Sequence, residues 1–267
     1  MGMRTVNGIR IAFDEAGAGN DVLLLVHGHP FDRSMWRSQI EAGSQAGWRV
    51  IAPDLRGYGE TTVVEGSTML ETFARDLAAL LDALGVGRMA IGGLSMGGQI
   101  AMEFARLYRE RVRGLILAAT FPQAETEEGR HIRLRTAERL LREGMGPYAE
   151  EVLPKMVAPR SIAAFPHVAA QVLAMMRSAH PHGAAAALRG RAERPPYDPV
   201  LAALEVPALI VVGDEDAFTT RADAERMHAL LNGSQLLWMQ GVGHLPNLER
   251  ESEFNAAMAE FLMRVAA

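Results

Sequence analysis

The stretch Ile91-Gly92-Gly93-Leu94-Ser95-Met96-Gly97-Gly98 sets one serine between glycines, directly after an apolar run and directly before a helical pattern. This pattern is typical of a sharp strand-to-helix turn, at which glycines without a Cβ leave room for the backbone to reverse. The hydroxyl of Ser95 would then project into open space. Because G-x-S-x-G also occurs in ordinary glycine-rich turns, the surrounding sequence has to support this interpretation.

The residues on either side of Ser95 favour a buried strand followed by a helix. Residues 88–94 form a short apolar run. After Ser95, apolar residues recur at helical spacing, at Ile100, Phe104 and Leu107. The serine is therefore expected between a strand and a helix, where a nucleophilic hydroxyl is exposed.

A serine hydroxyl needs a base within hydrogen-bond reach, and that base is usually oriented by a carboxylate. The chain has candidates for both, each directly after an apolar, strand-like run. Asp214 and Asp216 follow the run 208–212, and His244 follows the run 235–239. The order serine, aspartate, histidine is the one expected for this kind of turn.

These motifs together resemble the α/β-hydrolase fold superfamily along nearly the whole chain. Three further motifs agree with the resemblance, namely His27-Gly28-His29-Pro30, Asp54-Leu55-Arg56-Gly57-Tyr58-Gly59 and Gly243-His244-Leu245-Pro246-Asn247-Leu248-Glu249. The loop 27–36 and the length of the insertion described below are most similar to the group of carboxylesterases, enol-lactonases and cofactor-free perhydrolases. The resemblance implies a mostly parallel, eight-stranded sheet with helices on both faces.

The resemblance also implies the roles of the candidate residues. Ser95 would be the nucleophile, His244 the general base and then acid, and Asp216 the orienting carboxylate. Asp216 is preferred to Asp214 because the family usually places the acid three residues after the glycine that ends the strand. The oxyanion hole would consist of the backbone amides of His29 and Met96, and the latter lies at a helix start, where N–H groups lack intrahelical partners.

Two pairs of histidines have a spacing that metal ligands also show. His27 and His29 alternate in an extended segment, but a metal site needs three or four ligands. We expect His27 to brace its loop and His29 to touch the substrate or line the pocket. His180 and His182 flank a proline that favours an exposed turn. No metal and no cofactor are therefore expected.

Strands alternate with helical segments up to residue 120, which predicts a doubly wound α/β core. The next convincing strand begins only near residue 207, and the interval is too long for a loop. We expect a core domain at 1–120 and 201–267 and an inserted helical cap at 121–200. Its expected helices cover residues 126–142, 147–156, 167–178 and 183–193.

The cap is expected to form a soft, apolar ceiling over the serine. Met145, Met156, Phe165 and Met175 are the candidates within the cap, and Phe31 is the candidate in the core. The alternative is that these side chains only pack the cap helices together. An apolar pocket of this kind suits small, largely apolar esters.

The composition is that of one enzyme domain with an insertion. The chain has 267 residues, 49% of them hydrophobic, a formal net charge of −5 and no cysteine, so disulfides are excluded. Its basic residues are scattered, which argues against nucleic acid as a partner. No apolar run approaches the length of a membrane span and none marks a signal peptide, so we expect a cytoplasmic protein without membrane contact. The oligomeric state is not indicated.

The expected function is hydrolysis of a carboxylic ester through an acyl-enzyme on Ser95. A serine at the turn argues against haloalkane dehalogenases and most epoxide hydrolases of this fold, which use aspartate there. The same three residues would also serve an enol-lactonase or a hydrolase of carbon–carbon bonds. A small-molecule receptor of the same fold is a further alternative.

Overall fold

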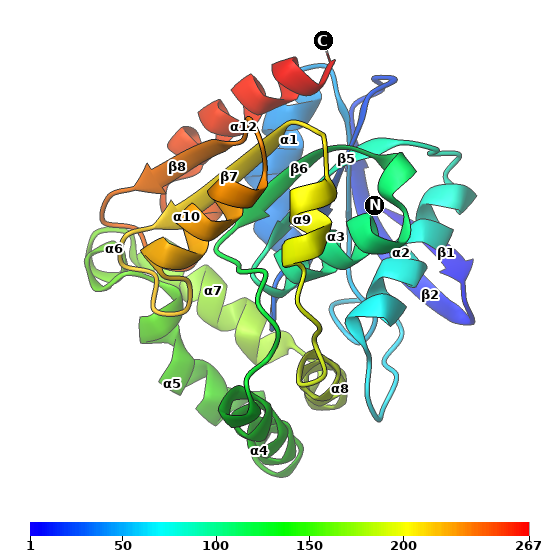
Figure 1. The fold of residues 1–267 in the computed structure, drawn as a ribbon. Coiled ribbons are helices and arrows are strands. Elements are labelled where there is room, and N and C mark those ends of the chain that lie inside the picture. The colour runs from blue at the N-terminus through cyan, green and yellow to red at the C-terminus, as the bar shows by residue number, and fades with distance from the viewer. Residues whose placement is uncertain (267) are drawn as a thin grey trace.

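The computed structural model describes residues 1–266, which fold around one eight-stranded sheet (Figure 1). The strand order is β1-β2-β4-β3-β5-β6-β7-β8. The two pairs that involve β2 are antiparallel and all other pairs are parallel, so the expected mostly parallel sheet is confirmed. The strands are β1 Gly2–Val6, β2 Ile9–Ala16, β3 Val22–Val26, β4 Arg49–Pro53, β5 Met89–Leu94, β6 Val112–Ala118, β7 Ala208–Gly213 and β8 Gln235–Met239.

Helices cover both faces of the sheet (Figure 1). One face carries α1 (Arg37–Gln45), which follows a 3₁₀ turn at Arg33–Trp36, and the C-terminal α12 (Glu251–Ala266). The other face carries α2 (Leu70–Ala83), α3 (Met96–Leu107), α9 (Asp198–Ala203) and α10 (Arg221–Leu230). Two short segments complete the core, a 3₁₀ turn at Arg109–Arg111 and α11 at Pro246–Glu249.

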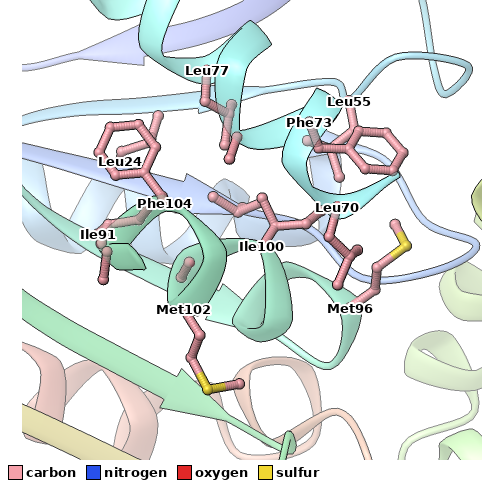
Figure 2. Packing of buried hydrophobic residues seen from close by; sticks show 14 of the residues in the cluster. Leu24, Leu55, Leu70, Phe73, Leu77, Ile91, Met96, Ile100, Met102 and Phe104 are labelled. Carbon is pink, nitrogen blue, oxygen red and sulfur yellow. The ribbon is translucent and has the colours of Figure 1, made fainter. Parts of the chain in front are cut away.

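The packing of α2 and α3 against the central strands fixes the position of the strand-to-helix turn. All residues of β3 and β5 are buried, as expected for parallel strands that are covered on both faces. Figure 2 shows Leu24 and Ile91 of these strands beside Phe104 of α3, and Phe73 of α2 elsewhere in the same cluster, beside Leu55. Since its apolar side chains hold α3 against the sheet, Ser95, the residue directly before this helix, has a fixed position.

The segment between β6 and β7 folds into helices, and five of them lie together below the sheet in Figure 1, at the carboxyl ends of β5 and β6. We call this group the helical insertion: α4 Glu127–Glu143, α5 Met145–Met156, α6 Pro159–Ala164, α7 Pro166–Ser178 and α8 Pro181–Arg191. Four of these helices match predicted ones, whereas α6 and α9 were not predicted. None of the helices within residues 1–266 has both the length and the apolar character needed to cross a lipid bilayer.

Candidate active site

Ser95 joins β5 to α3 and has an unusual backbone conformation, with φ 56° and ψ −116°. Residues other than glycine rarely adopt positive φ, and they do so mainly where the surroundings enforce it. Here the Ser95 amide donates to the carbonyl of Ala118 at 2.9 Å, and the Thr120 hydroxyl donates to the Ser95 carbonyl at 2.8 Å. The neighbouring strand β6 and the loop after it therefore hold the turn in place.

The turn also requires a glycine at position 97. A Cβ on Gly97 would collide with the carbonyl oxygens of Val26 and His27, at the end of the adjacent strand β3. This close approach brings the loop after β3 beside the first turn of α3. The loop that carries His29 is thereby placed next to Ser95.

His244 and Asp216 form a buried pair. Nδ1 of His244 lies 2.9 and 3.0 Å from Oδ1 and Oδ2 of Asp216. Oδ1 also accepts hydrogen bonds from the amides of Phe218 at 2.8 Å and Thr219 at 3.2 Å. Burial alone would raise the pKa of the Asp216 carboxyl, but His244 and the two amides together hold it below its ordinary value. The carboxylate is therefore the stable form, suited to hold an Nδ1–H group.

Asp214 has a different environment. Its Oδ1 accepts hydrogen bonds from the amides of Gly241 at 2.6 Å and Val242 at 3.4 Å. The carboxylate thus braces the turn after β8, and Asp216 rather than Asp214 contacts His244.

Ser95, His244 and His29 line one cavity of about 300 Å³ between the sheet and the helical insertion. Among the described residues, Ser95 makes no direct hydrogen bond to His244, and such contacts often tighten only when substrate binds. The ring of Phe218 packs edge-on against the imidazole of His244, with 4.8 Å between ring centroids. The cavity is lined by His29, Ser95, Gln99, Ala119, Thr120, Phe121, Ile132, Arg133, Thr136, Tyr148, Glu151, Val152, Lys155, Met156, Leu188, Arg191, Phe218 and His244.

The two amides expected for an oxyanion hole lie on segments that meet beside Ser95. Met96 is the first residue of α3, where the helix dipole favours negative charge. Within residues 1–266, neither the Met96 amide nor the His29 amide donates a hydrogen bond to another protein group. Both amides therefore stay candidates for an oxyanion, and their role is a prediction.

The buried side chains of His27 and His29 differ in their contacts. His27 bonds the backbone through both ring nitrogens: Nδ1 contacts the Gly28 carbonyl at 2.9 Å and Nε2 accepts from the Leu55 amide at 2.9 Å. It thus ties its loop to the loop after β4. His29 lies in the cavity wall with Nδ1 2.7 Å from the Tyr58 hydroxyl, and its Nε2 has no partner among the described residues.

Two further histidine features bear on the predictions. Burial, assisted by nearby arginines, lowers the pKa of His29 well below its ordinary value, so the ring is neutral at neutral pH.

At the start of α8, Nδ1 of His180 accepts from the His182 amide at 3.3 Å, and Nδ1 of His182 lies 3.3 Å from a carboxylate oxygen of Glu65. Residues 1–266 contain no group of three or more side chains placed to hold a metal ion.

Four of the five apolar residues predicted to line the pocket do not line this cavity. Phe31, Met145 and Met175 are buried in the hydrophobic core, where they pack elements together, as the alternative interpretation had it. Phe165 lies at the surface, with the Arg250 guanidinium 5.3 Å from its ring centroid. The cap residue Met156 does line the cavity.

The charged side chains of the cavity were not predicted from the sequence, above all Arg191 at the end of α8. Its guanidinium is buried, and its Nε donates to Oε1 of Gln99 at 3.1 Å. Burial and two neighbouring arginines lower the pKa of Arg191 well below its ordinary value. Of these neighbours, Arg133 forms an ion pair with Glu125, and Arg194 lies 3.4 Å from the same carboxylate. The sequence offered no signal for them, because basic residues are scattered along the whole chain.

Comparison with known proteins agrees with this geometry. The family model of the alpha/beta hydrolase fold matches residues 21–251. A thermophilic esterase from Thermogutta terrifontis, studied with malate bound, superposes with a TM-score of 0.95 at 40% identity over 99% of this chain and 97% of that one. A 2-hydroxy-6-oxononadienedioate/2-hydroxy-6-oxononatrienedioate hydrolase from Burkholderia vietnamiensis is 28% identical over 96% of this chain and 92% of that protein. A 3-oxoadipate enol-lactonase from Acinetobacter baylyi is 26% identical over 88% and 85%. The chain therefore belongs to the alpha/beta hydrolase fold family, as its motifs predicted.

Proposed function

We propose that this hydrolase cleaves carboxylic esters of small molecules through an acyl-enzyme intermediate. Ser95 is the nucleophile, His244 the general base and acid, and Asp216 the carboxylate that orients His244. The observation that carries the proposal is that a serine on a strand-to-helix turn shares one cavity with a histidine paired to a buried carboxylate. These are the parts that nucleophilic acyl transfer requires.

The reaction follows in two half-reactions. His244 takes the proton of the Ser95 hydroxyl as its oxygen attacks the ester carbonyl, and the amides of His29 and Met96 stabilise the oxyanion. His244 then gives the proton to the leaving alcohol. In the second half-reaction His244 deprotonates a water molecule, which attacks the acyl group and releases the acid and free Ser95.

The charges in the cavity support a narrower substrate class. Arg133, Lys155 and Arg191 line the cavity with one carboxylate, Glu151, so the local charge is positive. Glu125, which does not line the cavity, pairs with Arg133 and Arg194. Within residues 1–266 no carboxylate forms an ion pair with Arg191. A buried charge without a counterion is unfavourable, and an anionic group on the substrate would supply the counterion. We therefore expect the preferred ester to carry a carboxylate.

The relatives agree with a substrate of this kind. The hydrolase from Burkholderia vietnamiensis is named for dioates, and the enzyme from Acinetobacter baylyi is named for an oxoadipate enol-lactone. Malate, which is bound in the structure of the esterase from Thermogutta terrifontis, carries two carboxylates. An enol-lactone, or a carbon–carbon bond beside a carbonyl, is the second candidate substrate. The same catalytic residues would serve this substrate, and Arg191 would bind its carboxylate in the same way.

The first experiment measures hydrolysis of p-nitrophenyl esters from acetate to decanoate by the native protein and by Ser95→Ala. We expect turnover that depends on Ser95 and is fastest for short acyl chains. Full activity in Ser95→Ala would refute the proposed function. No turnover by the folded native protein would favour the lactone or carbon–carbon substrates.

A second pair of substrates tests the carboxylate preference. p-Nitrophenyl hydrogen glutarate and p-nitrophenyl valerate have acyl chains of equal length, and only the former is anionic. We expect kcat/KM to favour the glutarate by about 10- to 100-fold, the value of a charge-assisted hydrogen bond. Arg191→Gln should abolish the preference. Arg189→Gln, which alters a residue of α8 that bonds the Gly66 carbonyl outside the cavity, should keep it.

A further inference from the structure

Glu249, at the end of α11, is a buried carboxylate that the proposed reaction does not use. Its side chain accepts hydrogen bonds from three backbone amides. Oε1 accepts from Gly243 at 3.0 Å and from Leu245 at 3.3 Å, and Oε2 accepts from Ala158 at 3.0 Å. The residue is only 3% exposed, and no ion pair to it is found within residues 1–266.

The need for two accepting oxygens explains why a carboxylate occupies this position. Burying a charge is costly unless hydrogen bonds satisfy its lone pairs, and the three amides do so here. A glutamine has one accepting oxygen, and its NH₂ group can only donate. Glutamine at position 249 would therefore lose the bonds on one side, either to the amides of Gly243 and Leu245 or to the amide of Ala158.

Two of the three amides belong to the residues on either side of His244. The carboxylate of Glu249 thus fixes the backbone both before and after the proposed base. The amide of His244 itself donates to the carbonyl of Met156 at 3.1 Å. The position of the imidazole relative to the serine depends on these contacts.

The third amide, that of Ala158, belongs to the helical insertion. It lies in the short connection between α5 and α6, two residues after Met156. Since Val152 and Met156 of α5 line the cavity, the connection is the point where the cavity wall meets the loop of the histidine. Glu249 bonds both at once, one through each oxygen.

We propose that Glu249 is a positioning residue of this enzyme: its carboxylate holds the backbone around His244 and joins it to the insertion segment that forms the cavity wall. The inference rests on the proposed function, because it takes His244 to be the base. Glu249 does not touch the substrate in this account. Its effect is exerted through the placement of the imidazole.

The test compares Glu249→Gln with native protein in two assays. Hydrolysis of p-nitrophenyl butyrate gives kcat and KM. Reaction with a p-nitrophenyl alkylphosphonate gives a burst of p-nitrophenol, in which the amplitude counts competent sites and the rate constant reports how well Ser95 is activated. The matched control is Glu103→Gln, because Glu103 is equally buried but pairs with Arg106 on α3, away from the cavity.

We expect Glu249→Gln to lower kcat and the phosphonylation rate constant by about 10- to 100-fold, since small displacements of a catalytic group cost this much. The burst amplitude should stay near one per chain, and KM should change by less than about threefold. Glu103→Gln should lower the melting temperature without slowing phosphonylation. If Glu249→Gln lowers only the melting temperature and leaves both rates unchanged, Glu249 is structural and the inference is refuted.

Two further arms complete the test. If Glu249→Gln does not fold, Glu249→Asp keeps the charge but is one methylene shorter and cannot reach both segments. Slow phosphonylation of the folded aspartate variant supports the inference, and native rates refute it.

Ser95→Ala is assayed alongside. Its full activity would refute the proposed function, whereas an inactive Ser95→Ala beside a fast Glu249→Gln would refute the inference alone.

Discussion

Replacing Asp216 with asparagine tests the carboxylate beside His244, and the geometry determines how the substitution acts. Oδ1 of Asp216 accepts from the amides of Phe218 and Thr219, at 2.8 and 3.2 Å, and Nδ1 of His244 lies 2.9 Å from Oδ1 and 3.0 Å from Oδ2. An asparagine has to keep its carbonyl oxygen toward the two amides, because its NH₂ group cannot accept. The NH₂ group would then take the place of Oδ2 and face Nδ1 of His244.

A donor in that position favours the opposite tautomer of the ring. When Nδ1 accepts from the NH₂ group, the neutral imidazole of His244 carries its proton on Nε2 and cannot take the proton of Ser95. The equivalent substitution in a Ser-His-Asp protease lowers kcat by about 10⁴-fold. At 1.36 kcal/mol per factor of ten, this is a barrier increase of about 5 kcal/mol. We expect a loss of this order in kcat for p-nitrophenyl butyrate, with the protein still folded.

Asp214→Asn is the matched control, two residues away in the same loop. The Asp214 carboxylate accepts from two amides of the turn after β8 through Oδ1 alone, and an asparagine oxygen can do the same. We expect kcat within about threefold of the native value, as for a residue outside the reacting atoms. Loss of activity in Asp214→Asn together with retention in Asp216→Asn would refute the assignment.

Three further substitutions follow from single contacts. Gly97→Ala should lower the unfolding free energy by about 1–3 kcal/mol, measured in urea, because the new methyl group meets the carbonyl of Val26; native stability would argue against the close approach. Because burial lowers the pKa of His29 well below its ordinary 6.5, the unfolded chain takes up the proton first, and stability should fall as pH drops below 6.5. His29→Asn should make that decline shallower between pH 8 and 5, and an identical slope would contradict the reasoning. Phe218→Ala, which removes the ring against His244, should lower kcat up to about tenfold, since such aromatic contacts contribute about 0.5–1.5 kcal/mol; an unchanged kcat would show that the ring only covers the site.

The core of the fold could be predicted because local patterns and burial agree there. The predicted strand 88–94 is β5 at Met89–Leu94, and the helical spacing after Ser95 corresponds to α3 at Met96–Leu107. Strands buried on both faces appear in a sequence as continuous apolar runs, and glycines mark the turn between them.

Short helices between prolines were not predicted. Both α6 and α9 have 6 residues, fewer than two helical turns, so no periodic pattern can develop in them. The final helix α12 begins at Glu251 and is preceded by the short α11, and the two are separate because Arg250 leaves the helical conformation, with φ −142°. This division places Glu249 at a helix end, where its carboxylate reaches the loop of His244.

The pocket could be predicted least, because its wall depends on how the insertion helices are turned toward the core. Apolar character identifies Met145 and Met175 as buried residues, but burial in a core and exposure to a cavity have the same sequence pattern. The charged residues of the cavity wall could not be predicted for a different reason. Arg191 cannot be distinguished by sequence from the surface arginines around it, and only its packing against Gln99 makes it a cavity residue.

The attachment of α8 to the core gives Arg191 its fixed place. Gly183, near the start of α8, lies so close to the backbone of Gly57 that neither position has room for a Cβ. Further along, the Thr68 amide donates to the carbonyl of Ala186 at 2.9 Å. The helix is thus anchored directly to the connection between β4 and α2, and it also packs against α4. Because a charged group selects substrates only when its position is fixed, α8 is the wall of the cavity best suited to recognise a carboxylate. The other wall, formed by α5, is joined through Ala158 and Glu249 to His244. Substrate recognition and placement of the base therefore depend on different helices, and variants of Arg191 and Glu249 should change KM and kcat separately.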